Sequence, residues 1–113
     1  MREADLMDRI RELSRGDVRL FRNNVGVCVR DGARIPFGLA VGSPDLIGWR
    51  RTVITPDMVG RTVAVAVGIE VKTQTGRVRS EQRAFISHMQ EFGCLAGIAR
   101  SVEEASMIVS PHK

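Results

Sequence analysis

The chain of 113 residues is long enough for one domain with one apolar core and too short for two such domains. Apolar residues make up 43% and charged residues 27%, which excludes a disordered or fibrous protein, and the net charge of +4 suits a protein that meets phosphates. Apolar runs are too short to span a membrane and the amino terminus is amphipathic rather than a signal peptide, so we expect a cytoplasmic protein.

The first predicted element is an amphipathic helix over residues 3–14. Leu6 and Ile10 recur at helical spacing, and Gly16 follows the last turn. Glu3 lies three residues before Leu6 and seven before Ile10, so it belongs to the apolar face of this helix. A first-turn carboxylate is also favoured by the helix dipole and can simply be solvated, so periodicity leaves both interpretations of Glu3 open.

A block of β-prone segments follows, separated by turn residues. The Asp31-Gly32 pair lies between VGVCVR and ARIPFGLAVG and is a strong hairpin signal. Residues 45–54 predict a further strand, which begins with Asp45. The charge of Asp45 is expensive to bury unless a partner or a metal ion satisfies it.

The segment RTVAVAVGIEVKT, residues 61–73, predicts a strand with two apolar faces. Valines and Ile69 alternate with Ala64, Ala66 and Gly68, a pattern typical of a buried strand in a covered sheet. Glu70 and Lys72 then continue the face that carries the smallest side chains. The Glu-x-Lys spacing places both side chains on one side of the strand, which no helix would do.

The remainder predicts a helix, a short strand and a last helix. Ser80 is a plausible N-cap of the first of these helices, and Gln82 lies on its inward stripe with Phe85 and Met89. The strand is predicted at 95–99, and a capping box of Ser101 and Glu104 begins the last helix. The element order predicts an α/β fold with a central mixed β-sheet flanked by helices on both faces.

Acidic and basic residues at strand ends point to metal-dependent phosphate chemistry. If the strands of Asp45 and Glu70 are neighbours, two carboxylates and the ammonium of Lys72 come together. Phosphodiester hydrolysis needs carboxylate oxygens for Mg²⁺ or Mn²⁺ and a cation near the attacked phosphate. Cys28 and Cys94 are far apart with no CxxC spacing, so we expect packed thiols rather than a zinc site or a disulfide.

Several stretches resemble a known nuclease family. Pro44 and Asp45 followed by Glu70, Val71 and Lys72 match the PD-(D/E)xK nuclease superfamily, which shares the restriction-endonuclease-like fold. FRNNVG, FGLAVGSPDLIG, IEVKTQTGRVRSEQRAF and GIARSVEEA look like the VRR-NUC family of virus-type replication and repair nucleases. Its members include small phage proteins and the catalytic domain of a DNA crosslink repair nuclease. The resemblance implies a single nuclease domain over residues 1–113, in a prokaryotic or phage-infected cell.

The resemblance also implies roles for residues of the site. The implied ligands of Mg²⁺ or Mn²⁺ are the carboxylates of Glu3, Asp45 and Glu70 and the backbone carbonyl of Val71. Lys72 matches the lysine that orients or activates water, and Gln82 matches a helix glutamine that accompanies this site. The apolar-face position of Glu3 agrees with its implied role.

Contacts to DNA are expected from both halves of the chain. Arg22, Asn23 and Asn24 resemble the family's RNN motif, although asparagines before a glycine are also ordinary turn residues. The arginines of TQTGRVR follow Lys72 directly, although a charge run is more often only a solvated surface. The expected DNA-binding residues are Arg22, Asn23, Asn24, Ser43, Arg77 and Arg79.

These observations predict a metal-dependent DNA endonuclease that acts in DNA repair. The expected substrate is branched DNA such as a four-way (Holliday) junction. Symmetrical cleavage of a junction needs paired sites, so a homodimer is expected. The alternatives are a less selective nuclease on flaps, nicks or duplex DNA, and a DNA-binding module that retains the fold without activity.

Overall fold

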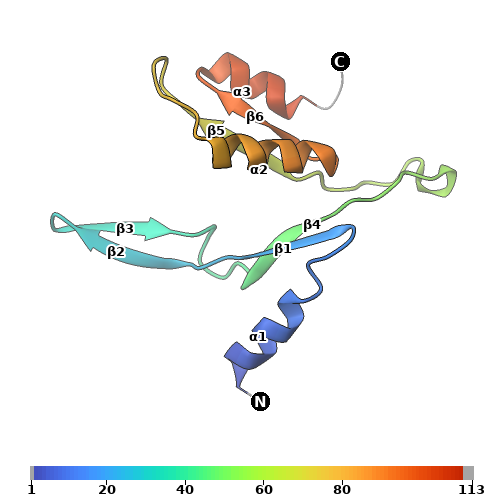
Figure 1. The fold of residues 1–113 in the computed structure, drawn as a ribbon, viewed down its shortest axis with the longest axis horizontal. Helices are drawn as coiled ribbons and strands as arrows, with labels where there is room; N and C mark the ends of the chain where they lie inside the picture. Colours follow the sequence, from blue (N-terminus) through green and yellow to red (C-terminus); the bar gives the residue numbers. More distant parts are fainter. Residues whose placement is uncertain (1, 111–113) are drawn as a thin grey trace. The chain divides into compact units, whose positions relative to one another are not determined.

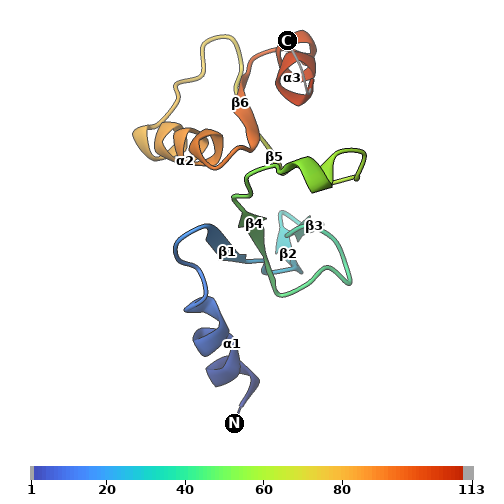
Figure 2. The same ribbon diagram turned by 90° about the vertical axis from the view of Figure 1, so that its right-hand side faces the viewer.

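The computed structural model describes residues 2–110 as two compact units, which divide between Arg50 and Arg51 (Figures 1 and 2). The first unit contains α1 (Glu3–Arg11), β1 (Val18–Arg22), β2 (Gly26–Arg30), β3 (Ala33–Phe37) and β4 (Leu46–Arg50). The second contains a 3₁₀ turn (Pro56–Met58), β5 (Val67–Val71), α2 (Ser80–Glu91), β6 (Leu95–Ala99) and α3 (Val102–Val109). The expected organisation as one domain stays a prediction, and each unit is described by itself.

The first unit is built on the antiparallel pair β1 and β4. Leu20 pairs with Gly48 in this ladder, and a Cβ atom on Gly48 would collide with the carbonyl oxygen of Arg19. Only glycine therefore fits at this position of β4. The rings of Phe21 and Trp49, one from each strand, lie 5.0 Å apart between centroids and form an aromatic contact across the pair.

The predicted hairpin is confirmed. β2 and β3 pair antiparallel, and their connection consists of Asp31 with φ of 52° and Gly32 with φ of 79°. Positive φ at both central residues is the signature of a type I′ turn, whose twist matches that of the flanking strands. The Asp-Gly pair supplies the two residue types that tolerate this conformation.

The second unit is a parallel strand pair between two helices. A Cβ atom on Gly68 of β5 would lie 2.6 Å from the sulfur of Met89 in α2, whereas one on Gly97 of β6 would lie 2.9 Å from Cδ1 of Ile108 in α3. The helices therefore cover opposite faces of the pair, as Figure 2 shows. Glycines allow both helices to approach closely. The most buried side chains among the described residues are Met89, Phe92 and Ala99, all in this unit.

The structure corrects the sheet predicted from the sequence. The α/β class is confirmed, but within residues 2–110 the strands form three two-stranded sheets, β1–β4, β2–β3 and β5–β6, instead of one central mixed sheet. The strand predicted over 61–73 is restricted to Val67–Val71, because only these residues pair along β6. Val71 is 75% exposed, so α3, which covers this face of the pair at Gly97, leaves the end of β5 uncovered.

Helix caps differ in detail from the prediction. Ser80 is the first residue of α2 rather than its N-cap, because the Gln82 side chain accepts the N–H of the preceding Arg79. Ser101 is the N-cap of α3, as predicted, and accepts the N–H of Glu104. Across residues 2–110, none of the helices has the length and apolar character needed to cross a membrane.

Candidate active site

A charged cluster lies on the face of β5 that α2 covers. Nζ of Lys72 lies 3.6 Å from Oε2 of Glu70, and the two side chains are 18% and 30% exposed. Glu70 and Lys72 project to the same side because they are two residues apart along an extended chain. The predicted juxtaposition of carboxylate and ammonium is therefore present within the second unit. Partial burial limits screening by solvent and strengthens their interaction.

Gln82 completes this cluster from the first turn of α2. Its Nε2 donates to Oε2 of Glu70 over 3.0 Å, while its Oε1 accepts the N–H of Arg79 over 3.0 Å. The second hydrogen bond fixes which end of the amide faces the carboxylate, since only the nitrogen can donate. Both contacts of Glu70 use Oε2, and within residues 2–110 no partner is found for Oε1. Glu70 thus keeps an oxygen for a further ligand.

The cluster lies where the parallel strands end. Val71 pairs with Ala99, and the N–H of Lys72 donates to the carbonyl of Ala99 over 3.0 Å. The carboxyl ends of parallel strands are the usual position of ligand sites in α/β proteins. Arg77 and Arg79 follow in the loop between β5 and α2, and both are exposed. Arg79 also forms an exposed ion pair of 3.3 Å with Glu81, which contributes little to stability.

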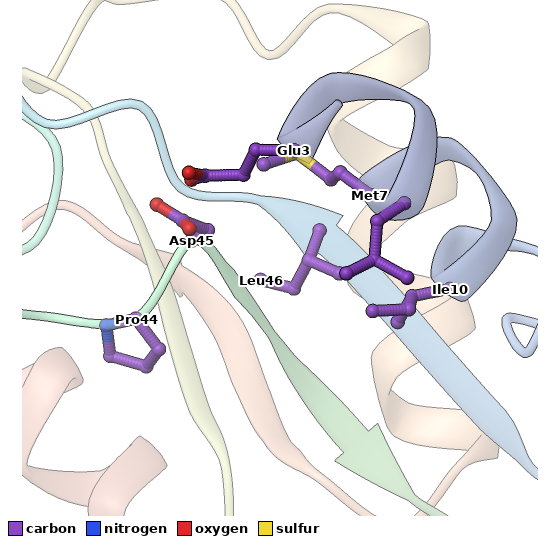
Figure 3. A pocket seen from close by; sticks show the side chains of 7 residues that line it. Glu3, Met7, Ile10, Pro44, Asp45 and Leu46 are labelled. Carbon is purple, nitrogen blue, oxygen red and sulfur yellow. The ribbon is translucent and has the colours of Figure 1, made fainter. Parts of the chain in front are cut away.

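The first unit contains a second acidic site. A pocket of about 300 Å³ is lined by Glu3, Leu6, Met7, Ile10, Pro44, Asp45 and Leu46. The predicted apolar face of the first helix lines this pocket, and Glu3 lies on that face. Figure 3 shows the carboxylates of Glu3 and Asp45 ending close together in this view, beside the apolar side chains of the pocket. Neither carboxylate has a hydrogen-bonding or ionic side-chain partner in the described part of the chain.

Asn23 holds the segment that carries Asp45. Its backbone N–H donates to the carbonyl of Asp45 over 2.8 Å, and its Nδ2 donates to the Ser43 hydroxyl over 2.6 Å and the Pro44 carbonyl over 2.9 Å. Its Oδ1 accepts the N–H of Leu39 over 3.1 Å. Asn23 and Ser43 therefore fix the approach to Asp45 through their own hydrogen bonds. This arrangement matches the turn interpretation of the asparagines, and a DNA contact of either residue stays a prediction.

The remaining predicted DNA-binding residues of the first unit are accessible. Arg22 ends β1 and Asn24 follows Asn23, and both are exposed. The side-chain hydrogen bonds that hold the loop of Asp45 come from Asn23 and Ser43, so the side chains of Arg22 and Asn24 are available at the surface. Their contacts with DNA stay a prediction, as do those of Arg77 and Arg79.

The donor chemistry fits a hard divalent cation. Within the described residues no three His, Cys, Asp or Glu side chains gather at one place, and the acidic residues form one pair in the first unit and one cluster in the second. Mg²⁺ and Mn²⁺ prefer oxygen ligands, and Mg²⁺ binds through one or two carboxylates while keeping several waters. The exposed carboxylates of Glu3 and Asp45, which line one pocket, offer oxygen ligands of this kind.

Sequence reasoning missed two residues that organise these sites. Asn23 was identified only as a candidate DNA contact, although its side chain makes three hydrogen bonds within the protein. Arg100 was not identified at all. The available signal was an arginine directly between an apolar strand and an N-cap serine, and the structure shows that this arginine is half-buried and therefore needs acceptors.

Comparison with known proteins identifies one family. The VRR-NUC domain matches residues 17–103, a range that covers most of the chain and includes Asp45, Glu70, Lys72 and Gln82. None of the curated proteins or solved structures that were compared matches the chain.

Proposed function

Because the chain belongs to the VRR-NUC family, whose domains are nucleases, we propose that it is a metal-dependent endodeoxyribonuclease of the PD-(D/E)xK type that cleaves branched DNA. The observation that supports this most is the cluster of Glu70, Lys72 and Gln82 at the carboxyl end of a parallel strand. A module that only binds DNA has no need to hold a carboxylate and an ammonium together in a half-buried place. Family membership also supports a restriction-endonuclease-like core.

The proposed metal ligands are the side chains of Glu3, Asp45 and Glu70 and the backbone carbonyl of Val71. The free Oε1 of Glu70 and the unpartnered carboxylates of Glu3 and Asp45 agree with this set. A bound Mg²⁺ or Mn²⁺ supplies Lewis-acid polarisation of the phosphate and favours ionisation of water near neutral pH. In this proposal Glu3 completes the ligand set of Asp45.

Lys72 and Gln82 are proposed to assist the reaction without binding the metal ion. The Lys72 ammonium donates hydrogen bonds to the attacking water or to a phosphate oxygen, and its partial burial strengthens both interactions. Gln82 fixes the rotamer of Glu70 by donating to Oε2, so the carboxylate presents Oε1 in a constant direction. Hydrolysis then leaves a 5′-phosphate and a 3′-hydroxyl, as the superfamily resemblance implies.

The proposed DNA contacts are made with the phosphate backbone. Arg22, Arg77 and Arg79 are exposed cations suited to phosphates, and Asn24 offers an exposed amide. Asn23 and Ser43 support the loop of Asp45, and their donor groups serve hydrogen bonds within the protein, so a direct contact of either with a phosphate requires one of these bonds to be exchanged. The chain's net charge of +4 favours association with DNA.

A four-way junction is the proposed substrate and a homodimer the proposed working state. One small site cuts one strand, so symmetrical cleavage of two strands requires two sites related by a two-fold axis. Sedimentation of the protein with and without junction DNA tests the dimer. A monomer on the DNA contradicts it.

Cleavage of labelled four-way junction, flap, nicked and linear duplex DNA tests the proposed function. Each substrate is incubated with Mg²⁺, with Mn²⁺ and with EDTA, using wild type and the Glu70→Ala variant in parallel. We expect metal-dependent cutting of the junction at symmetrical positions, abolished in Glu70→Ala. Glu91→Ala is the matched control, because Glu91 is an exposed glutamate at the far end of α2.

Each other outcome has a definite meaning. Equal cutting of all substrates identifies a less selective nuclease. Junction binding without cleavage in any metal identifies a non-catalytic binding module. Undiminished cleavage by Glu70→Ala shows that the assigned site is wrong or that a contaminating nuclease is present.

A further inference from the structure

Arg100 joins the end of β6 to the loop that follows β5. Its Nη1 lies 2.6 Å from the carbonyl oxygen of Thr73, 2.8 Å from that of Gly76 and 3.4 Å from that of Gln74. The two N–H groups of this nitrogen suffice for the two short hydrogen bonds, and the third is shared. One guanidinium therefore collects three carbonyl groups of one short loop.

The backbone of Arg100 is fixed on both sides. Its N–H donates to Oε1 of Glu104 over 2.6 Å, and its carbonyl accepts from Nε2 of Gln74 over 3.1 Å. Glu104 lies in the first turn of α3, so the side chain of Arg100 extends from an anchored position. Gln74 belongs to the loop itself and closes a reciprocal pair of hydrogen bonds with Arg100.

The loop held in this way separates Lys72 from the two exposed arginines. Thr73 follows Lys72 directly, and Gly76 precedes Arg77, which stands two residues before Arg79. Apart from its hydrogen bonds with Arg100, the loop has a hydrogen bond from the N–H of Gly76 to the carbonyl of Thr73 over 3.2 Å. Fixing residues 73–76 therefore limits the positions that Arg77 can take.

We propose that Arg100 is a positioning residue for DNA binding: its guanidinium holds the loop of residues 73–76 so that Arg77 and Arg79 are presented to the phosphate backbone. This inference rests on the proposed function and adds a residue to it. The role proposed for Arg100 is indirect, because its Nη1 is used by the loop. Preorganisation lowers the entropy cost when the two arginines bind.

A lysine cannot replace this arginine. Lysine carries a compact ammonium on a flexible stem, whereas the planar guanidinium offers donors in a fixed arrangement. The variants Arg100→Lys and Arg100→Gln therefore separate charge from geometry. Arg83→Gln is the matched control, because Arg83 is an exposed arginine on α2 and its replacement removes the same charge.

The first measurement is the affinity for labelled four-way junction with Ca²⁺ in place of Mg²⁺, as a function of salt. We expect both Arg100 variants to bind roughly tenfold more weakly and to show a smaller salt slope, by about one for each phosphate that the variant no longer neutralises. In steady-state cleavage, KM rises by a similar factor while kcat stays within about twofold of wild type. Arg83→Gln keeps the wild-type KM.

The second measurement follows the loop without DNA. Trypsin cuts after Arg77 and Arg79 when the loop opens, so limited digestion reports its order. We expect faster cleavage at these two sites in both Arg100 variants, at an unchanged Tm. This result separates a local effect on the loop from general unfolding.

Three results overturn the proposal. Arg100→Lys with wild-type affinity shows that charge suffices. Faster trypsin cleavage without weaker DNA binding shows that the loop does not position a DNA-binding residue. A fall in kcat and Tm with unchanged KM assigns a merely structural role to Arg100. If wild type cleaves no DNA, the proposed function fails, whereas binding and trypsin cleavage still decide the role of Arg100.

Discussion

The two acidic sites of the chain differ in what surrounds their carboxylates. Glu70 in the second unit accepts a hydrogen bond from Gln82 and forms an ion pair with Lys72, so the protein sets the orientation of its carboxylate. Glu3 and Asp45 in the first unit line one apolar pocket, and their carboxylates end close together without such partners among the described residues (Figure 3). The first arrangement is organised by side chains of the protein, whereas the carboxylates of the second have no such partners among the described residues.

The two units therefore fix their carboxylates in different ways. In the second unit, side chains fix the carboxylate directly. In the first unit, Asn23 fixes the backbone at Asp45, and the side chain of Asp45 has no partner among the described residues. Replacing Lys72 or Gln82 in the second unit should therefore lower the cleavage rate. Replacing Asn23 should also lower the free energy of unfolding of the first unit.

The largest expected effect is that of Lys72→Met, which keeps the aliphatic stem and removes the ammonium. Cleavage should fall roughly 10²- to 10⁴-fold, the range for removal of a group that acts on a proton in the transition state. Binding of Mn²⁺, measured by calorimetry, should persist because Lys72 is no ligand. Arg83→Met serves as the control, and a Lys72→Met rate within a few-fold of wild type contradicts the role assigned to Lys72.

Gln82→Ala should have the next largest effect. Removal of a group that orients a metal ligand typically costs roughly 10- to 100-fold in affinity or activity. Without an acceptor for the Arg79 N–H, the protein should also be less stable by about 1 kcal/mol. Gln90→Ala is the control, since Gln90 lies on the same helix but donates to the carbonyl of Ala96. Equal metal affinity and cleavage rates in the two variants would remove Gln82 from the site.

Asn23→Ala should destabilise the first unit, whereas Asn24→Ala should not. The first variant removes the hydrogen bonds of Asn23 with the Leu39 N–H and the Pro44 carbonyl, which are exposed, so the cost is about 0.5 to 1.5 kcal/mol. Trp49 is the single tryptophan and lies in β4, so its fluorescence during urea unfolding reports on this unit. Equal unfolding midpoints for the two variants would show that the loop is held by other interactions.

The smallest expected effect concerns the thiols. Burial raises the pKa of the Cys94 thiol, while Cys28 is exposed. Because the thiolate is the reactive form, Cys94 should alkylate more slowly than Cys28 at pH 8. The unfolded chain ionises this thiol first as pH rises, so its contribution to stability is present below the ordinary thiol pKa and is lost above it. Mass spectrometry after brief alkylation measures the difference, and faster modification of Cys94 contradicts it.

Local patterns in the sequence predicted the elements that local chemistry determines. The Asp-Gly turn, the strand at 95–99 and the apolar face of the first helix appear in the structure as predicted. The Glu-x-Lys spacing on one strand also placed Glu70 beside Lys72. The turn and the Glu-x-Lys pair depend on residues close together in the sequence, whereas the strand and the helix face were predicted from local periodicity and find distant partners in the structure.

The same local patterns could not predict interactions between residues far apart in the sequence. An alternating apolar segment predicted a long buried strand, but its length depends on which residues find a partner along β6. Asn23 and Arg100 bind loops about 20 and 26 residues away, and nothing local in the sequence identifies such acceptors. Spacing therefore predicted the contact of Glu70 with Lys72 but not the hydrogen bonds that support the candidate sites.

The proposal that Asp45 and Glu70 are both required for DNA cleavage makes the sharpest prediction. Its most direct test is single-turnover cleavage of four-way junction DNA in Mg²⁺ by Asp45→Asn, by Glu70→Gln and by the double variant. We predict that each single variant falls to the level of wild type in EDTA and that the double variant falls no further, as expected for residues that act as a unit. Retention of the wild-type rate by either single variant would contradict this account.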